Sequence, residues 1–422
     1  MAEVAAGARA DEVERRLRAG AAQEALGVVH ELARHTPLLT SGTLEERCGG
    51  KILLKAENLQ RTGSFKLRGA LAKLASLPAA ASGDGGSRGV VAGSAGNHAQ
   101  SLAYAAHARG FQCEVFMPRE ASVAKLAAVG AYGGSVVLGG ESVEECVAAA
   151  IERARETGAT FVHPFDDAEV IIGQATVGVE LLADVPDLAK VIVPIGGGGL
   201  ASGIGGVIKL ARPDVQIVGV QVQATAPFPA SLAAGEPLAV DGASTIADGI
   251  AVKRPGDLTL PLVARFVDEV VLVSEDEVAE AMVLLMERAK LVVEGAGAVG
   301  VAALLAGSVA SAPTGTTVVV LSGGNVDAGL LALVARRHEV AVGRRLRIAT
   351  AVSDRPGGLA ALLTWVAEAG GNLIAVEHVR DTVDLQVRQT SVELTLETRG
   401  ADHAEAILSA LRDGGYRVQL LA

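Results

Sequence analysis

Residues 190–210 have the sequence KVIVPIGGGGLASGIGGVIKL, in which an apolar run leads into four consecutive glycines and then into a second apolar run. The first run predicts a strand over 190–194, and the second predicts a helix. Four glycines allow the backbone to wrap around a phosphate, and the dipole of the following helix attracts its negative charge. The loop contains neither Lys nor Arg, so backbone amides must dominate the binding. A strand, a glycine loop and a helix form one unit of an α/β fold with a parallel sheet.

The same alternation of strands and helices extends through most of the chain. It predicts parallel sheets covered by helices on both faces, because helical runs separate the strand-like runs. We expect a domain over residues 1–330 with a nested smaller domain at about 87–163, bounded by a Gly/Asp junction at 84–86 and a second edge near 163–167. Residues 1–25 predict either a polar, Ala-rich helix or a loose tail. Strands are expected at 52–55, 89–92, 113–117, 135–138, 190–194, 217–222, 269–273 and 317–321, and the first helices at 64–77, 97–109, 121–129 and 142–157.

The pattern changes near residue 345, where shorter runs follow the order β-α-β-β-α-β. That order describes a small ferredoxin-like α+β domain. We place this domain at 345–422, with strands at 346–352, 372–379, 390–397 and 416–420 and helices at 357–369 and 401–412.

Composition limits the classes of function. The chain has 422 residues, half of them apolar, and a net charge of −11 without a dominant Lys/Arg cluster, so nucleic acid is not an expected partner. The three cysteines are widely spaced and form no C-x-x-C motif, which argues against a disulfide framework or a zinc site and favours a reducing compartment. The N-terminus lacks the apolar stretch of a signal peptide, and the glycines within 191–210 argue against a membrane span. We therefore expect a cytoplasmic protein.

The glycine loop also fits a dinucleotide-binding fingerprint loosely, as Gly196-x-Gly198-x-x-Ala201. That fingerprint needs an acidic residue roughly 20 positions further on, at the end of the next strand. Position 221 is Gln, so we do not expect NAD. A purely structural run of four glycines is also disfavoured, because each glycine costs about 1 kcal/mol in chain entropy.

The segment 61–70, RTGSFKLRGA, places a lysine in the first turn of a predicted helix. Ser64 can cap this helix, and Phe65 partly removes Lys66 from water. Desolvation and the positive end of the helix dipole both lower the pKa of a lysine, as the amine of a Schiff base requires. An isolated lysine is more often a solvated surface residue, so the assignment depends on the other segments.

Two further loops carry polar residues where strands end. Residues 94–100, SAGNHAQ, place small residues at a helix N-terminus, where backbone amides suit a carboxylate and Asn97 can donate to a phenolate-like oxygen. Residues 321–325, LSGGN, place Ser322 at the C-terminal end of a strand, which faces the usual ligand crevice. Taken alone, the first loop fits an ordinary capped loop equally well. A lone histidine such as His98 is more often structural than catalytic, and the second loop by itself is more often a plain turn.

Together these four segments resemble the threonine/serine dehydratase family of pyridoxal-phosphate enzymes, the branch known as fold type II. The resemblance runs from about Thr36 to Asn325, and the segments 245–253 and 294–298 share it. It implies an α/β protein with two parallel-sheet, three-layer domains of the tryptophan synthase β-like kind. It also implies pyridoxal 5'-phosphate as the cofactor.

The resemblance assigns a role to each of the four loops. Lys66 holds the cofactor as an imine, is displaced by the substrate amine and then removes the Cα proton. A neutral hydroxyl at Ser322 keeps the pyridine nitrogen largely unprotonated, which favours elimination over transamination. The resemblance further implies that Phe65 packs near the ring, that Asn97 binds the ring hydroxyl oxygen, that Gly196, Gly197, Gly198, Gly199 and Leu200 hold the phosphate, that Ser322 meets the pyridine nitrogen, and that Ser94, Gly96 and His98 line the pocket for the substrate carboxylate.

The family implies dehydration and deamination of L-threonine to 2-oxobutanoate and ammonia. The alternatives are an L-serine dehydratase giving pyruvate, a non-catalytic amino-acid sensor, and a racemase. A racemase of this family needs a serine where this chain has Ala95, which has no proton to exchange. Residues 221–230 contain no carboxylate, so we do not expect the divalent-cation site of some relatives. The sequence does not decide between isoleucine biosynthesis and threonine breakdown.

The C-terminal residues resemble a single ACT regulatory domain. Residues 354–358, DRPGG, match the loop that often contacts an amino-acid effector. The resemblance implies an allosteric enzyme with an amino-acid or nucleotide effector and assembly into a dimer or tetramer. The alternative is a tail used only for contacts between subunits.

Overall fold

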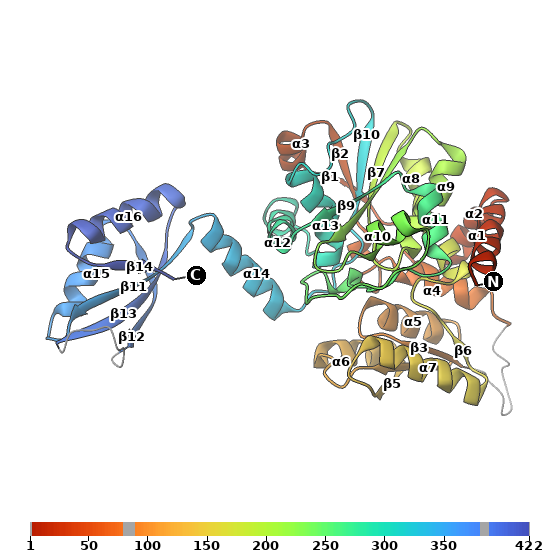
Figure 1. Ribbon diagram of the computed structural model, residues 1–422, viewed down its shortest axis with the longest axis horizontal. Coiled ribbons are helices and arrows are strands. Elements are labelled where there is room, and N and C mark those ends of the chain that lie inside the picture. Colours follow the sequence, from red (N-terminus) through yellow and green to blue (C-terminus); the bar gives the residue numbers. More distant parts are fainter. Residues whose placement is uncertain (1, 79–88, 380–387, 422) are drawn as a thin grey trace. The chain divides into compact units, whose positions relative to one another are not determined.

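The computed structural model describes residues 2–78, 89–379 and 388–421 (Figure 1). The chain forms two compact units, Met1–Asp327 and Ala328–Ala422. The Gly/Asp junction expected at 84–86 lies outside the described residues.

A six-stranded sheet in the order β1-β2-β10-β7-β8-β9 forms the centre of the first unit. Neighbouring strands are parallel, apart from the antiparallel pair β1 and β2 at one edge. Apolar β-branched residues fill the central strands, which are buried at nearly every position, as a parallel sheet covered on both faces requires. The strands are β1 Leu38–Thr40, β2 Lys51–Lys55, β7 Leu188–Pro194, β8 Gln216–Val222, β9 Glu269–Val273 and β10 Thr316–Val320.

Helices connect these strands and supply the other half of the core. Val191, Ile217 and Val318 of the sheet pack with Leu181 and Ile204 of two of the helices. The longer helices are α8 Ala168–Asp184, α9 Gly199–Ala211, α11 Thr259–Phe266, α12 Glu275–Leu284 and α13 Gly295–Leu305. Shorter elements are α3 Gly42–Cys48, α10 Pro227–Ala234, single turns at Glu57–Leu59 and Asp248–Ile250, and a π-helical turn at Leu285–Ala289.

Residues 90–161 form a second, wholly parallel sheet in the order β5-β4-β3-β6. Figure 1 shows this sheet with α5, α6 and α7 as a layer distinct from the six-stranded sheet. Helix α4, Lys66–Ala75, packs against both α5 and α8 and so links the two layers. The elements are β3 Val90–Gly93, β4 Cys113–Met117, β5 Ser135–Leu138, β6 Thr160–Phe161, α5 Asn97–Ala108, α6 Val123–Ala131 and α7 Val143–Thr157.

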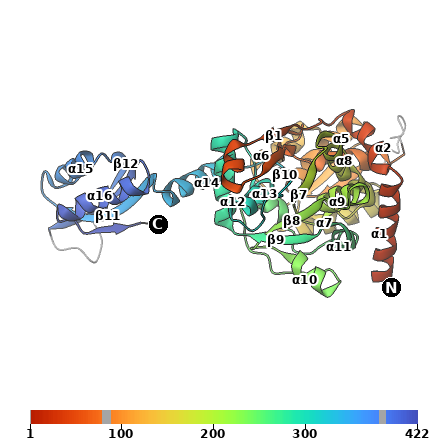
Figure 2. The ribbon, with the colours of Figure 1, turned by 90° about the horizontal axis from the view of Figure 1, so that it is seen from above.

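The N-terminal residues form helices, so the alternative of a loose tail is wrong. Helices α1 Ala2–Arg18 and α2 Ala21–His30 lie beside α8, α9 and α11 (Figure 2). Ala10, Val13 and Leu17 are buried in a cluster with Phe266 of α11. Burial of these apolar residues stabilises α1, because a helix of this length is only marginally stable in water without tertiary packing.

The expected cap at the start of α4 is also wrong. The residue before the helix is Phe65, which makes no side-chain capping bond, and the helix begins at Lys66. Ser64 instead forms an antiparallel bridge with Gly323, and its buried hydroxyl finds no hydrogen-bond partner in the part of the chain that the structure describes. A tertiary contact therefore replaces the local cap, because pairing with the loop after β10 pulls Ser64 away from the helix end.

The second unit confirms the ferredoxin-like prediction. After α14, Ala328–Ala341, the elements follow the order β-α-β-β-α-β, and the antiparallel sheet has the order β12-β13-β11-β14. Ile348, Leu394 and Ile407 lie at its core. Its elements are β11 Arg345–Ser353, α15 Gly358–Glu368, β12 Asn372–Val379, β13 Gln389–Glu397, α16 Ala401–Asp413 and β14 Val418–Leu420. Among the described helices of the whole chain, none combines the length and hydrophobicity that a membrane span needs.

A buried ion network anchors α4 two residues after its first lysine. The Arg68 guanidinium, which is fully buried, donates twice to Glu57 (2.8 and 2.8 Å) and twice to Glu180 (2.6 and 3.0 Å). Lys55, also fully buried, lies 2.5 Å from Glu180. Burial alone would raise the pKa of Glu180, but Arg68 and then Lys55 lower it to about 2. Removal of one partner from a buried ion pair strongly destabilises the folded protein, because the other charge is left buried and unpaired.

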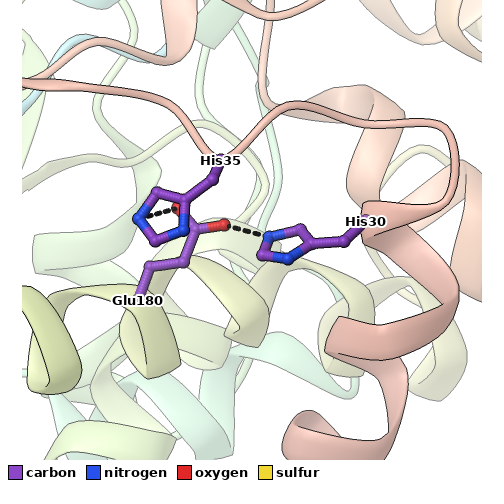
Figure 3. A group of neighbouring side chains, drawn as sticks. All are labelled: His30, His35 and Glu180. Carbon is purple, nitrogen blue, oxygen red and sulfur yellow. Dashed lines mark hydrogen bonds and ion pairs between the residues drawn. The ribbon is translucent and has the colours of Figure 1, made fainter.

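Two histidines close this network on its solvent side. Figure 3 shows the rings of His30 and His35 facing the Glu180 carboxylate. The Nε2 of His30 lies 2.8 Å from Glu180 Oε1, and that of His35 lies 3.9 Å from Glu180 Oε2 and 2.6 Å from Asp184. The three side chains have the spacing of a metal site. Both oxygens of Glu180 already accept from buried cations, however, and a further cation would be repelled, so we assign the cluster to the ion network.

Candidate active site

A cavity of about 890 Å³ in the first unit gathers the loops that the sequence singled out. It lies where parallel strands of both sheets end, which is the usual ligand crevice of α/β proteins. Its lining includes Lys66, Ser94, Gly96, Asn97, His98, Gly196, Gly197, Gly198, Gly199, Leu200, Ser322 and, beside the amine, Phe65. All the predicted site residues therefore line one cavity, and their contacts with a bound cofactor remain predictions.

Lys66 is the first residue of α4, and its amine is enclosed. Its Nζ donates to the carbonyl of Pro164 (2.8 Å) and lies 5.3 Å from the centre of the Phe65 ring. Burial lowers the pKa of Lys66 to about 8, against a smaller opposing effect of the Glu294 carboxylate. About a tenth of such amines are unprotonated at pH 7, far more than for a solvated lysine. Lys66 therefore has the reactivity that imine formation requires.

The four glycines form a cradle of free amides between β7 and α9. Gly198 has φ +97°, which favours glycine, and α9 begins at Gly199. Among the described residues, no acceptor pairs with the amides of Gly196–Gly199. Thr259 Oγ1 donates to the carbonyl of Gly197 (2.6 Å) and holds the loop in place. Free amides at a helix N-terminus suit a phosphate dianion, so this loop and Lys66 together fit pyridoxal phosphate.

The β3–α5 loop and the segment after β10 complete the cavity. The amide of Gly96 donates to Ser94 Oγ (3.2 Å). His98 Nε2 lies 2.9 Å from the carbonyl of Val162, and burial, then the Lys66 charge, lowers the pKa of His98 to about 3, so its ring is neutral. The Ser322 hydroxyl makes no hydrogen bond within the described part of the chain, whereas its carbonyl accepts from the amide of Phe65 (3.1 Å). A neutral hydroxyl beside the lysine segment is thus available to a ligand.

Three residues of the site were not predicted. Glu294 hydrogen-bonds Asn97, and the ring of His163 packs edge-on against Phe165 with centroids 4.6 Å apart. His163 Nδ1 accepts from the amides of Phe165 (3.2 Å) and Asp166 (2.8 Å), which fixes the course of this loop past the glycines. The family-like segment 294–298 was the only signal for Glu294, because a carboxylate that meets Asn97 across 197 residues of chain has no fixed spacing in the sequence.

Replacement of Gly197 with alanine should weaken cofactor binding. A Cβ at this position would lie 2.3 Å from the Phe165 ring, so the ring or the loop must move. We expect the Kd for pyridoxal phosphate, measured by absorbance titration of the apoprotein, to rise at least about tenfold, the value of one lost charged hydrogen bond. Gly27→Ala is a matched control, because a Cβ there meets nothing within 4 Å. An unchanged Kd in Gly197→Ala would show that the loop does not hold the phosphate.

Comparison with known proteins agrees with this site. A family model described as pyridoxal-phosphate dependent enzyme matches residues 29–323. The chain therefore belongs to the family of pyridoxal-phosphate-dependent enzymes. Within that family it is similar to the L-threonine ammonia-lyase of Geobacter sulfurreducens, to which it is 46% identical over 399 residues, 94% of this chain and 98% of the relative.

Solved structures confirm the fold type II prediction for the first unit. The threonine deaminase of T.th. is 39% identical with a TM-score of 0.67, and the match covers 73% of this chain and 98% of that one. Maize serine racemase is 34% identical with a TM-score of 0.70, over 76% of this chain and 97% of that one. A threonine deaminase and a serine racemase thus share this architecture, so the residues of the site and not the fold must determine the reaction.

Proposed function

We propose that this chain is a threonine ammonia-lyase, which converts L-threonine into 2-oxobutanoate and ammonia with pyridoxal 5'-phosphate bound at Lys66. Its similarity to an L-threonine ammonia-lyase over nearly the whole length of both chains supports the reaction. The observation that carries the proposal is the half-buried amine of Lys66, whose pKa burial lowers to about 8, in the same cavity as four glycine amides that find no acceptor among the described residues.

The residues of the cavity divide the work between binding and proton transfer. Pyridoxal phosphate, when bound, supplies an aldehyde that condenses with amines and a ring that withdraws electrons from the substrate Cα. Lys66 would hold the cofactor and, once released, accept the Cα proton at neutral pH. The amides of Gly196–Gly199 and Leu200 would hold the phosphate, and Phe65 would pack beside the ring. Ser322 would meet the ring nitrogen with a neutral hydroxyl, which favours elimination over transamination.

The β3–α5 loop would bind the substrate carboxylate. Ser94, Gly96 and His98 line the cavity at the N-terminus of α5, where backbone amides attract a negative charge. Because His98 is held neutral by burial, it adds polarity without adding charge. Ala95, also in the cavity lining, has no proton to exchange, so we propose elimination and not racemisation.

An assay of 2-oxo acid formation from threonine and from serine tests this proposal. We expect turnover of threonine, with no formation of D-allothreonine, the product of inversion at Cα alone. The two substrates differ by one methyl group, worth about 1–3 kcal/mol in transition-state binding, so the ratio of kcat/KM values decides between them. A higher kcat/KM for serine would support the L-serine dehydratase. A protein that binds pyridoxal phosphate and turns over neither amino acid would support the non-catalytic sensor.

For the second unit we propose a regulatory ACT domain. The loop 354–358 joins β11 to α15, and Gly357 has φ +93°, a conformation that favours glycine. We place an amino-acid or nucleotide effector at this loop, in a cytoplasmic homodimer or homotetramer. Regulation requires a different effector affinity in two states, so the threonine assay should be repeated with isoleucine, valine and AMP.

A further inference from the structure

Glu294 is a buried carboxyl in the lining of the cavity, and the proposed mechanism does not yet use it. It is 5% exposed and forms no ion pair within the described ranges. Burial, followed by the Asp248 carboxylate, raises the pKa of Glu294 to about 7, while a hydrogen bond from Asn97 and the charge of Lys125 oppose the rise. An unpaired buried carboxyl is costly, so its hydrogen bonds must compensate for the loss of water.

A chain of hydrogen bonds fixes the orientation of the Asn97 amide. The carbonyl of Thr62 can only accept, so the atom of Asn325 that lies 2.8 Å away must be the donor Nδ2. The same Nδ2 lies 2.7 Å from Asn97, which must therefore present its oxygen. Asn97 then turns its own Nδ2 to Glu294, at 2.7 Å from Oε1. One hydrogen of that Nδ2 is used by Glu294, and the second remains for the cavity.

The surrounding backbone is shaped to admit the carboxyl. A Cβ at Gly323 would lie 2.2 Å from Glu294 Oε1 and 3.2 Å from Asn97 Nδ2. The carbonyl of Gly323 accepts from the amide of Glu294 (3.1 Å), so the loop after β10 and the start of α13 hold each other. Only glycine at 323 leaves room for the contact between Glu294 and Asn97.

We infer that Glu294 is a positioning residue that holds the Asn97 amide with an N–H directed at the ring hydroxyl oxygen of pyridoxal phosphate. The inference rests on the proposed function, which places that oxygen at Asn97. Without Glu294 only the bond from Asn325 holds the Asn97 amide. The amide plane can then tilt about that one bond, and its remaining N–H no longer points at the cofactor oxygen. Glu294 thus acts on the cofactor through Asn97 and not by contact with the reacting atoms.

Replacement of Glu294 tests the inference through cofactor binding. In Glu294→Ala we expect the Kd for pyridoxal phosphate to rise at least about tenfold, as for loss of a hydrogen bond to a charged group, with a shifted absorption maximum of the bound cofactor. Glu294→Gln keeps an oxygen for Asn97 and should remain much closer to wild type in both measurements. Glu294→Ala with the wild-type Kd and spectrum would overturn the inference.

A double-mutant cycle separates positioning from a general structural role. If Glu294 acts through Asn97, Glu294→Ala adds no further loss of affinity in an Asn97→Ala protein; an equal loss in both backgrounds overturns the inference. If Glu294→Ala does not fold, as judged by circular dichroism, Asn325→Ala removes the other tie on Asn97 and should give the same spectral shift. A wild-type protein that binds no pyridoxal phosphate would refute the proposed function itself, whereas normal wild-type binding and turnover beside an unaffected Glu294→Ala refutes only the role of Glu294.

Discussion

Lys66→Ala is expected to abolish the formation of 2-oxobutanoate from threonine and to remove the visible absorption band of the bound cofactor. The amine is enclosed and its pKa is lowered to about 8, so it is the group in the cavity best suited to form an imine and then to accept a proton. Loss of a group with both roles should lower kcat by about a thousandfold or more. Steady-state assays and an absorption spectrum of the purified variant measure the two effects.

Lys51→Ala is the matched control, because that lysine is exposed and its charge pairs with Asp187 outside the cavity. The control should retain the spectrum and the activity of the wild type. A Lys66→Ala protein that keeps full activity and the absorption band would refute the assignment of Lys66 and, with it, the proposed mechanism.

The sequence predicted the parts of the site that depend on backbone shape. Four adjacent glycines after an apolar strand have few structural uses, so the loop at 196–199 could be assigned from residue type alone. The strand and helix boundaries were also close, with Cys113–Met117, Ser135–Leu138 and Glu269–Val273 confirmed at their predicted ends. These elements are set by local apolar periodicity, which a sequence displays directly.

The parts that depend on long-range contacts could not be predicted. Asn97 meets Glu294 and Asn325 across 197 and 228 residues of chain, and nothing in the local pattern of either loop specifies this meeting. The cap assigned to Ser64 failed for the same reason, since a bridge to Gly323 outweighed its local propensity. Side-chain orientation within the site therefore had to come from the structure, although the residue types had already indicated the chemistry.

Arg68→Met is expected to destabilise the first unit by about 3–5 kcal/mol, the usual effect of removing one partner from a buried ion pair. Among the described residues, the substitution leaves Glu57 with only the hydroxyl of Thr36 as a side-chain donor and leaves Glu180 with Lys55 and the histidines. Urea unfolding of the apoprotein, followed by far-UV circular dichroism, measures the loss. Because Arg68 lies on α4, the rate of pyridoxal-phosphate capture by Lys66 should fall as well.

The chain offers an internal control for this experiment. Its one tryptophan, Trp365, lies in α15 of the second unit, so the unfolding midpoint measured by tryptophan fluorescence should not change. Arg212→Met, which breaks an exposed pair with Asp214, should cost no more than about 1 kcal/mol.

The stability that Glu180 contributes is complete above its ordinary pKa of 4.5 and is lost as the pH falls towards 2, so the deficit of Arg68→Met should shrink over that range. A deficit that stays constant from pH 7 to pH 3 would mean that Arg68 stabilises α4 by packing of its side chain and not by its charge.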